Sequence, residues 1–452
     1  MAWIETQTGS WQRPIGENEA MIKMIGDGGR QLGKDVWSIS VTASLTTHVE
    51  LNQLSKALRD GWKTLRFRHP SIASTSNDET LNYLTPTILD LEEWVDETFV
   101  TVEENVTLDD IIASLTPKRF PTLYFMRKDV AVLLHLSHWR TDGIGAFHIL
   151  NAYLEASAEA LQEEPPKLPW GEEVIRLVPS VEEALSLPRT PSLDIERAVK
   201  KYLDTLANNI GALGTPYKSG VGLVPKATRS ALLPLSADET ANLEARCRQL
   251  GIELHAALHA AVTATAYTIS TSTTNHKHHT STMRQSLRPH LPAPYDGVAG
   301  AAGLYTAGYM AKVPATQSWL ENARQYHAEY VKGATADLLC SRRQYALIMR
   351  NNLKKASIPD PPPSGLDFSY IPNAFGLVKS VYGDATTSFV VHDIGIGIDV
   401  VSRHLYVFAW VFNGRLTLRL VYNEAFYDAT FAKGILVLVK EHLVSNLVSV
   451  TP

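Results

Sequence analysis

The chain has 452 residues with globular proportions of apolar and charged side chains, too long for one hydrophobic core, which predicts two domains of roughly 200 residues each. Its net charge of −5, with no block of like charges, argues against a nucleic acid or an anionic membrane as partner. No apolar run reaches about 18 residues, the N-terminus lacks signal-peptide features, and two cysteines are too few for a disulfide scaffold, so we expect a cytoplasmic protein.

The first strong pattern is an amphipathic helix in the N-terminal half. Large apolar residues recur at spacings of three and four, at Leu51, Leu54, Leu58, Trp62 and Leu65. Thr47 with Glu50 matches a Ser/Thr-x-x-Glu capping box, which predicts the helix start, and Pro70 ends the helix. The segment Ser71–Ser74 is then expected to form a strand.

A strand, a turn and a helix follow around one histidine. The apolar, β-branched run from about Asp129 to Leu136 predicts a strand. His138 comes next in a tight turn that Asp142 and Gly143 close, and Ile144 opens a helix. This order places a proton-accepting imidazole on rigid backbone at a strand end, as acyl transfer to a weak nucleophile requires.

A proline-punctuated segment from Glu163 to about Lys226 separates the two halves and predicts a long crossover connection, with one helical patch over Leu193–Leu213. After it, Ser236 and Glu239 form another capping box, for a helix that ends at Gly251. A second helix is expected over Leu254–Ile269.

Near the C-terminus, the proline-rich segment Pro359–Gly365 excludes a helix or a central strand. The runs His404–Phe412 and Arg415–Tyr422, joined by Asn413-Gly414, predict a hairpin with a type I′ turn. An apolar helix is expected from Asp428 to about Leu447.

Strands and helices interleave throughout, which predicts a mixed α/β fold built from two αβ modules. We expect an N-terminal lobe at residues 1–165 that carries the His138 turn, a crossover linker at 166–226 and a C-terminal lobe at 227–452.

Two histidine groups have the spacing of metal ligands. His255 and His259 lie four residues apart on an expected helix, but no glutamate stands between them and no third ligand is evident, which favours helix packing. The segment Asn275–His279 lies in Ser/Thr-rich sequence and predicts an exposed loop with at most adventitious metal affinity. We therefore expect no functional metal site.

Several motifs together resemble one known group. The pattern His138-x-x-x-Asp142-Gly143 resembles the HxxxDG signature of the chloramphenicol acetyltransferase-like superfamily, which includes plant BAHD acyltransferases, peptide-synthetase condensation domains and fungal alcohol O-acyltransferases. Segments similar to the fungal enzymes of the trichothecene 15-O-acetyltransferase type are Trp11–Pro14 with Glu17 and Glu19, Trp62–Arg66, His69–Ala73, Trp170–Glu172 and Ser286–Leu291. The resemblance covers nearly the whole chain in order and spacing.

The resemblance implies two similar lobes with an active-site tunnel between them. It implies that His138 is the general base, that Asp142 points away from the tunnel and pairs with an arginine, and that Gly143 lets the backbone pass close to the substrate. Arg288 is the expected partner of Asp142, with Arg284 as the alternative.

Two departures from the superfamily bear on function. Ser137 stands where condensation domains carry a first histidine, which argues against a condensation domain. The plant-type D-F-G-W-G motif is reduced to Asp367-Phe368-Ser369-Tyr370, in which Ser369 is a candidate hydrogen-bond donor to the oxyanion.

The sequence therefore predicts an acyl-CoA-dependent O-acyltransferase that acts on a hydroxyl of a small natural product. Two alternatives remain for an active enzyme: a donor carried on a carrier protein, or the same fold used for a cyclisation or rearrangement without a thioester. A non-catalytic binding or scaffold protein is disfavoured because the histidine motif is intact. We expect no tightly bound cofactor, with acyl-CoA as cosubstrate, and a monomer, since one chain supplies both lobes. No Gly-rich phosphate loop is present, so no residue is assigned to the CoA phosphates.

Overall fold

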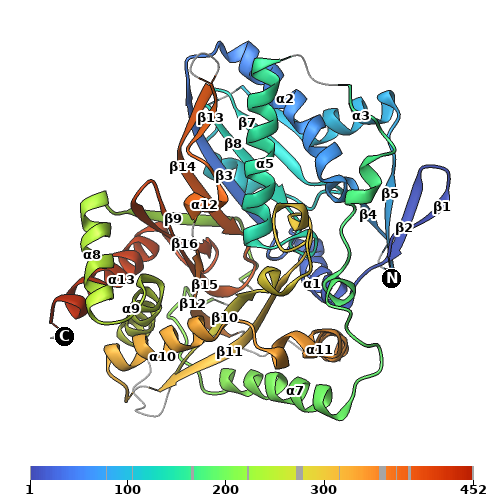
Figure 1. The fold of residues 1–452 in the computed structure, drawn as a ribbon. Helices are drawn as coiled ribbons and strands as arrows, with labels where there is room; N and C mark the ends of the chain where they lie inside the picture. Colours follow the sequence, from blue (N-terminus) through green and yellow to red (C-terminus); the bar gives the residue numbers. More distant parts are fainter. Residues whose placement is uncertain are drawn as a thin grey trace.

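The computed structural model describes residues 2–77, 79–103, 105–163, 167–220, 223–270, 278–314, 316–355, 363–372, 374–384 and 388–449 (Figure 1). Parts of three predictions lie outside these residues: the domain boundary at 165–166, residues 275–277 of the histidine-rich segment, and residues 359–362 of the proline-rich segment.

The N-terminal lobe is built on a six-stranded sheet in the order β13-β14-β3-β8-β7-β6. Its strands are β3 (Ile39–Thr47), β6 (Phe99–Val102), β7 (Thr122–Met126), β8 (Ala131–Leu136), β13 (Val381–Gly383) and β14 (Ser388–Ile398). Helices α2 (Leu51–Arg68) and α5 (Gly143–Gln162) pack together against one face, as Figure 1 shows. On the other face Tyr124 and Leu133 pack with Leu115 and helix α4 (Leu108–Ser114). Strands β7 and β8 are buried along their whole length, as expected for a sheet covered on both faces.

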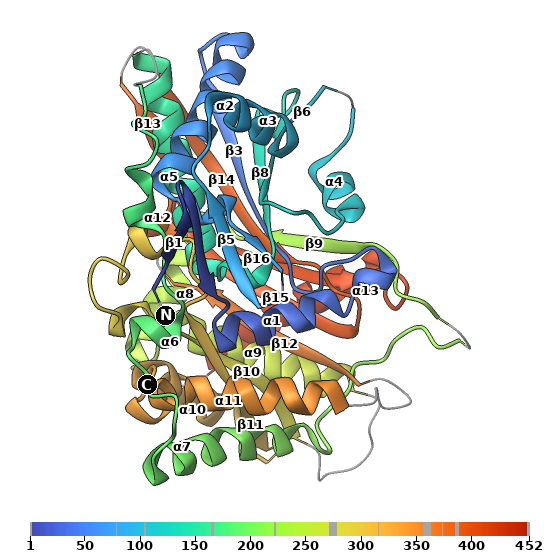
Figure 2. The same ribbon diagram turned by 90° about the vertical axis from the view of Figure 1, so that its right-hand side faces the viewer.

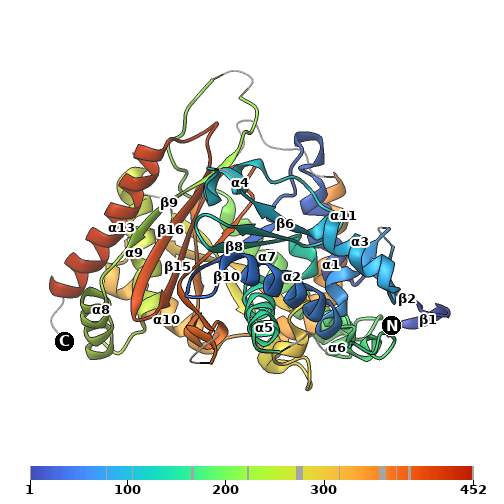
Figure 3. The same ribbon diagram turned by 90° about the horizontal axis from the view of Figure 1, so that it is seen from above.

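The C-terminal lobe contains a four-stranded sheet in the order β12-β15-β16-β9 and a two-stranded ribbon. The sheet comprises β9 (Thr228–Pro234), β12 (Ser364–Ile371), β15 (Arg403–Phe412) and β16 (Arg415–Asn423), and the ribbon comprises β10 (His278–Ser286) and β11 (Thr306–Pro314). Its helices are α7 (Leu193–Asp204), α8 (Ala237–Gln249), α9 (Leu254–Ile269), α10 (Trp319–Lys332), α11 (Ala336–Lys355) and α13 (Ala429–Ser449). Seen from above, α8, α9 and α13 lie at the opposite end of the molecule from α2 and α3 (Figure 3).

Smaller elements complete the N-terminal lobe and the crossover. A sheet in the order β1-β2-β5-β4 lies at the edge of the lobe. The elements are β1 (Ile4–Gln7), β2 (Ser10–Pro14), β4 (Thr75–Ser76), β5 (Thr80–Leu84), α1 (Glu17–Asp27), α3 (Ile88–Thr98), α6 (Val181–Ala184) and α12 (Ala374–Leu377). Single turns of 3-10 helix are η1 (Arg30–Leu32), η2 (Pro70–Ala73), η3 (His138–Arg140), η4 (Glu173–Arg176), η5 (Thr205–Asn209), η6 (Arg288–His290) and η7 (Val298–Gly300).

Strand β15 is shared between two hydrophobic cores. Its residues Tyr406, Phe408 and Trp410 belong to the core of the N-terminal lobe. The alternate residues Leu405 and Val407 belong to the core of the C-terminal lobe. Because successive side chains of a strand point to opposite faces, β15 buries one face in each lobe, which explains its unbroken apolar sequence.

The sheet of the N-terminal lobe also contains two strands from the C-terminal half of the chain. Strand β14 pairs antiparallel with β3, from Phe389 opposite Thr47 to Ile398 opposite Ile39, and β13 pairs with β14, so these two strands complete the N-terminal sheet. This sheet therefore combines strands from both sides of the boundary predicted at residue 227.

Several local predictions are confirmed. Asn413 and Gly414 both have positive φ angles, 48° and 72°, as a type I′ turn requires. The second helix of the C-terminal half runs over Leu254–Ile269, and the Ser236–Glu239 capping box is formed. No helix in the described part of the chain combines the length and apolarity needed to cross a bilayer.

Two local predictions in the N-terminal half are wrong. Thr47 is the last residue of β3, and Glu50 is the residue that precedes helix α2, so no capping box forms there. Of the predicted strand Ser71–Ser74, the first three residues lie in the 3-10 turn Pro70–Ala73 and only Ser74 is extended, because proline fixes a helical φ angle at the first position of the turn.

Candidate active site

His138 lies at the junction of strand β8 and helix α5, the position predicted from the sequence. It begins the turn η3, and its Nδ1 lies 2.9 Å from the backbone carbonyl oxygen of Thr141. A carbonyl oxygen only accepts hydrogen bonds, so Nδ1 carries the hydrogen and Nε2 of the neutral ring holds the free lone pair. The turn thus fixes one tautomer and leaves Nε2 as the proton acceptor.

Asp142 caps helix α5 and forms the expected ion pair with Arg288. Nη1 of Arg288 lies 2.6 and 2.7 Å from the two carboxylate oxygens, and both side chains are buried. The backbone amides of Gly145 and Tyr305 donate to the same carboxylate at 3.0 and 2.9 Å. Burial alone would raise the pKa of the Asp142 carboxyl, but Arg288 and the two amides together hold that pKa below its ordinary value.

The alternative partner, Arg284, lies elsewhere. Its Nη2 is 2.7 Å from Asp367, and its Nη1 donates to the carbonyl of Phe368 at 2.9 Å. Arg284 on β10 therefore binds strand β12, which carries the remnant of the D-F-G-W-G motif, and Asp367, not Asp142, is the carboxylate with which it pairs.

Residues 300–305 of the C-terminal lobe form hydrogen bonds with the His138 turn, and the sequence did not predict this contact. The Thr141 hydroxyl donates to the carbonyl of Ala301 at 2.6 Å. Arg288 donates to the carbonyl of Gly303 at 3.2 Å, and the amide of Tyr305 reaches Asp142 as described above. Residues 300–305 thus hold the turn from the side of the C-terminal lobe.

Two glycines lie in the first turn of α5, and their surroundings differ. A Cβ at Gly143 would meet the tips of two flexible side chains, Ile396 Cδ1 at 3.2 Å and Ile371 Cδ1 at 3.7 Å. A Cβ at Gly145 would come closer than 3.0 Å to the Thr141 hydroxyl, the Arg288 guanidinium and the backbone carbonyl of Ala301. The contact between the lobes therefore leaves no room for a side chain at Gly145. In the sequence, the Gly143-x-Gly145 spacing was the feature that could have indicated this position.

Two polar neighbours of His138, Ser137 and Arg140, form contacts that the sequence did not predict. The hydroxyl of Ser137 donates to the carboxylate of Asp35 at 2.6 Å, and burial raises the pKa of Asp35. The guanidinium of Arg140 donates to the backbone carbonyls of Ser74 and Arg119 at 2.8 and 2.7 Å, and burial lowers its pKa to about 10. Both sets of hydrogen bonds connect the turn to other segments of the N-terminal lobe.

Ser369 is half-buried on the edge strand β12. Ile371, two residues along the same strand, reaches toward Gly143 with its Cδ1 atom. Side chains two apart in a strand share a face, so Ser369 lies on the face of β12 that borders the start of α5.

The histidines weighed as metal ligands lie in the C-terminal lobe. His259 is fully buried, with Nδ1 3.0 Å from the Tyr330 hydroxyl and Nε2 2.6 Å from the Ser281 hydroxyl, so both nitrogens are engaged. His255 pairs with Glu253 at 3.2 Å. The prediction of an exposed loop is wrong for His278 and His279, which are buried at the start of β10 because that strand packs against α9 and β12.

Comparison with known proteins identifies the family of this chain. A family model described as 15-O-acetyltransferase Tri3 matches residues 100–269, which contain the turn from His138 to Gly143. Acetyltransferase pigO of Monascus ruber is 43% identical over 451 residues, which cover 99% of this chain and 98% of that protein. The chain belongs to the fungal Tri3-like acyltransferase family.

One further relative and one solved structure align with nearly all of this Tri3-like chain. O-acetyltransferase pigM of Monascus ruber is 27% identical over 99% of the chain and 87% of its own length. The solved structure of TRI3 trichothecene 15-O-acetyltransferase from Fusarium sporotrichioides superposes with a TM-score of 0.81 at 17% identity, covering 98% of this chain and 97% of that one. The predicted family resemblance and the mixed α/β, two-lobed fold are confirmed, and the tunnel stays a prediction.

Proposed function

We propose that this Tri3-like protein is an acyl-CoA-dependent O-acyltransferase for a hydroxyl group of a small natural product. The acceptor oxygen attacks the thioester carbonyl carbon while Nε2 of His138 takes the hydroxyl proton. The tetrahedral intermediate then collapses, the C–S bond breaks, and the proton passes from His138 to the CoA sulfur. The products are an ester and free CoA.

One observation carries the proposal: the hydrogen bond from Nδ1 of His138 to the Thr141 carbonyl. It presents Nε2 as a base whose orientation does not depend on the substrate, because the accepting carbonyl belongs to the same turn. The buried Asp142–Arg288 pair supports this role by keeping the turn rigid. Asp142 is therefore a positioning residue in this mechanism.

The oxyanion of the tetrahedral intermediate needs a hydrogen-bond donor. We assign this role to Ser369, because its strand face borders the start of α5 and its side chain is half-buried. Removing one donor from an oxyanion hole lowers kcat by roughly 100- to 1000-fold. Ser369→Ala should show a loss in this range.

The test measures acyl transfer from acetyl-CoA to a panel of hydroxylated natural products, including a trichothecene alcohol, with detection of the ester by mass spectrometry. His138→Ala should lower turnover by at least 100-fold, since general bases contribute roughly 100- to 10,000-fold, with an unchanged melting temperature. His290→Ala, which removes an exposed histidine, is the matched control and should retain turnover.

Near wild-type turnover in His138→Ala would show that the mechanism is wrong. Transfer from an acyl group on a carrier protein, with none from acetyl-CoA, would show that the assignment of the donor is wrong. A product formed from the acceptor alone would instead favour a cyclisation or rearrangement.

A further inference from the structure

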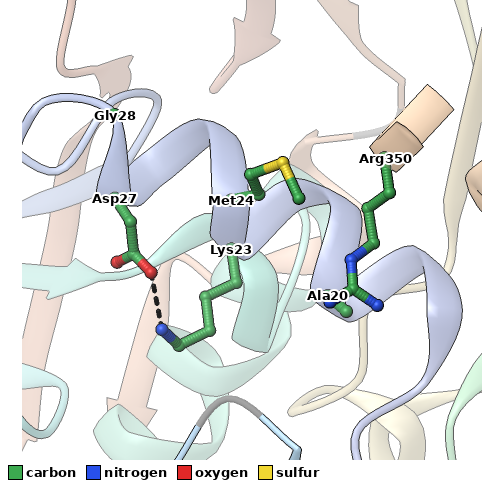
Figure 4. A pocket seen from close by; sticks show the side chains of 6 residues that line it. All are labelled: Ala20, Lys23, Met24, Asp27, Gly28 and Arg350. Carbon is green, nitrogen blue, oxygen red and sulfur yellow. Dashed lines mark hydrogen bonds and ion pairs between the residues drawn. The ribbon is translucent and has the colours of Figure 1, made fainter. Parts of the chain in front are cut away.

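A cavity of about 410 Å³ lies between α1 of the N-terminal lobe and α11 of the C-terminal lobe (Figure 4). It is lined by Ala20, Lys23, Met24, Asp27, Gly28 and Arg350. Its volume is in the range of small-molecule sites, and its position between two lobes is a frequent one for such sites. Figure 2 shows α1 passing above α11 at this junction. None of the residues assigned above to catalysis lines it.

The cavity carries an excess of positive charge. Nζ of Lys23 and Nε of Arg30 each lie 2.6 Å from the Asp27 carboxylate, so one acid is shared by two cations. Arg30 lies outside the cavity; Arg350 adds the second cation of the lining from α11, and its side chain extends toward Ala20 in Figure 4. Among the residues that line the cavity, Lys23 and Arg350 against Asp27 leave a local charge of +1, in a chain whose net charge is −5.

Arg350 has unused hydrogen-bonding capacity. Its Nε atom is buried, yet it has no hydrogen-bond partner among the described residues. A buried donor without a partner is costly, so a ligand that supplies an acceptor there is favoured. A guanidinium fork suits phosphate oxygens in particular.

The cavity and the catalytic turn share one helix. Helix α1 packs against η3, the turn that begins with His138. A Cβ at Gly26 of α1 would collide with the carboxylate of Asp35, and that carboxylate accepts from Ser137, the residue before His138. A ligand anchored against the outer face of α1 is therefore one helix away from the base.

We propose that this cavity binds the phosphate groups of the acyl-CoA donor, with Arg350 and Lys23 as the phosphate contacts. The apolar side chains of Ala20 and Met24 offer a surface for the uncharged parts of the same molecule. This inference rests on the proposed function, because it names the site at which that function recognises its donor.

The experiment compares two donors: acetyl-CoA and S-acetyl-N-acetylcysteamine, a thioester without phosphates. Arg350→Ala should raise KM for acetyl-CoA about tenfold or more relative to KM for the phosphate-free donor, with kcat little changed. Arg350→Lys should restore part of the difference, because it keeps the charge but not the fork. Lys354→Ala, one turn further along α11 and exposed, is the matched control and should leave both KM values unchanged.

Calorimetric titration with CoA provides a second readout that needs no turnover. Wild-type protein should bind CoA, and Arg350→Ala should weaken binding by a similar factor. Equal KM changes for both donors, or unchanged CoA affinity in Arg350→Ala, would overturn the site while leaving the proposed function intact. Phosphate-dependent CoA binding without any acyl transfer would support the site and overturn the proposed function.

Discussion

Two aspartate–arginine pairs in this molecule are built alike and placed differently. Asp142 accepts hydrogen bonds from Arg288 and from the backbone amides of Gly145 and Tyr305. Asp367 accepts from Arg284 and from the backbone amides of Thr282 and Phe368. In both carboxyls burial acts to raise the pKa, and the arginine with the two amides holds it below its ordinary value.

The pairs differ in what they join and in how far water reaches them. The Arg288 side chain is 4% exposed and connects the His138 turn to the C-terminal lobe. The Arg284 side chain is 36% exposed and connects two strands within the C-terminal lobe. The comparison shows how one chemical arrangement gives different stability: an enclosed pair has no water to replace a lost partner, whereas a half-open pair has.

The enclosed pair should show the largest effect. Arg288→Ala leaves the Asp142 carboxylate buried with its two amide donors only, and should lower the free energy of unfolding by about 3–5 kcal/mol. Acyl transfer should fall with it, since the turn loses its ion pair with the C-terminal lobe and keeps only the hydrogen bonds from Thr141 to Ala301 and from Tyr305 to Asp142. Urea denaturation measures the first effect. A loss below about 1 kcal/mol would mean that the pair is not what joins the lobes.

The crowding beside the enclosed pair gives the next effect. Gly145→Ala forces a methyl group against the Ala301 carbonyl and Arg288, which should cost about 1–3 kcal/mol and reduce kcat. The matched control is Gly434→Ala on helix α13, where no atom lies within 4 Å of the added methyl group. That variant should gain up to about 1 kcal/mol by helix propensity. Equal behaviour of the two variants would contradict the crowding argument.

The two aspartate–arginine pairs and the buried histidine His135 should contribute to the pH dependence of stability in different pH ranges. Burial lowers the pKa of His135, on β8, from its ordinary 6.5 to about 4, so the folded protein keeps this ring neutral while the unfolded chain takes up a proton. Stability should therefore fall as pH decreases from 6.5 toward 4, whereas the two aspartates lose their contribution only below their ordinary pKa of 3.8.

His135→Leu should make this pH dependence shallower by about 1.4 kcal/mol per pH unit. The free energy of unfolding measured by urea denaturation at several pH values between 6.5 and 4 gives the slope. An unchanged slope in the variant would show that His135 is not the group that titrates.

The half-open pair should show the smallest effect. Arg284→Ala leaves Asp367 with two amide donors and with water entering where the guanidinium was, and should cost about 1 kcal/mol. Thermal unfolding beside Arg288→Ala gives the comparison directly. A cost equal to that of Arg288→Ala would mean that exposure does not decide the strength of these pairs.

The elements predicted correctly depend on neighbours in the sequence. The Asn413-Gly414 turn requires two positive φ angles, and the helix over Leu254–Ile269 follows from local apolar spacing. The strand, turn and helix around His138 are of this kind too, which is why the position of this histidine was predicted from the chain alone. The partner Arg288 came from the family resemblance, because 146 residues separate it from Asp142 and no local pattern joins them.

Only the tertiary structure decided the rest. Which strand borders β3, why Gly145 admits no side chain, and why His278 and His279 are buried all depend on segments that are far apart in sequence. The Thr47 cap and the Ser71–Ser74 strand failed because their local signals are weak and compete with pairing in β3 and with the proline-led turn. The sequence by itself determined the turn that carries His138, since hydrogen bonds within a few residues hold it. The packing of distant segments determined the joint between the lobes that keeps the turn in place.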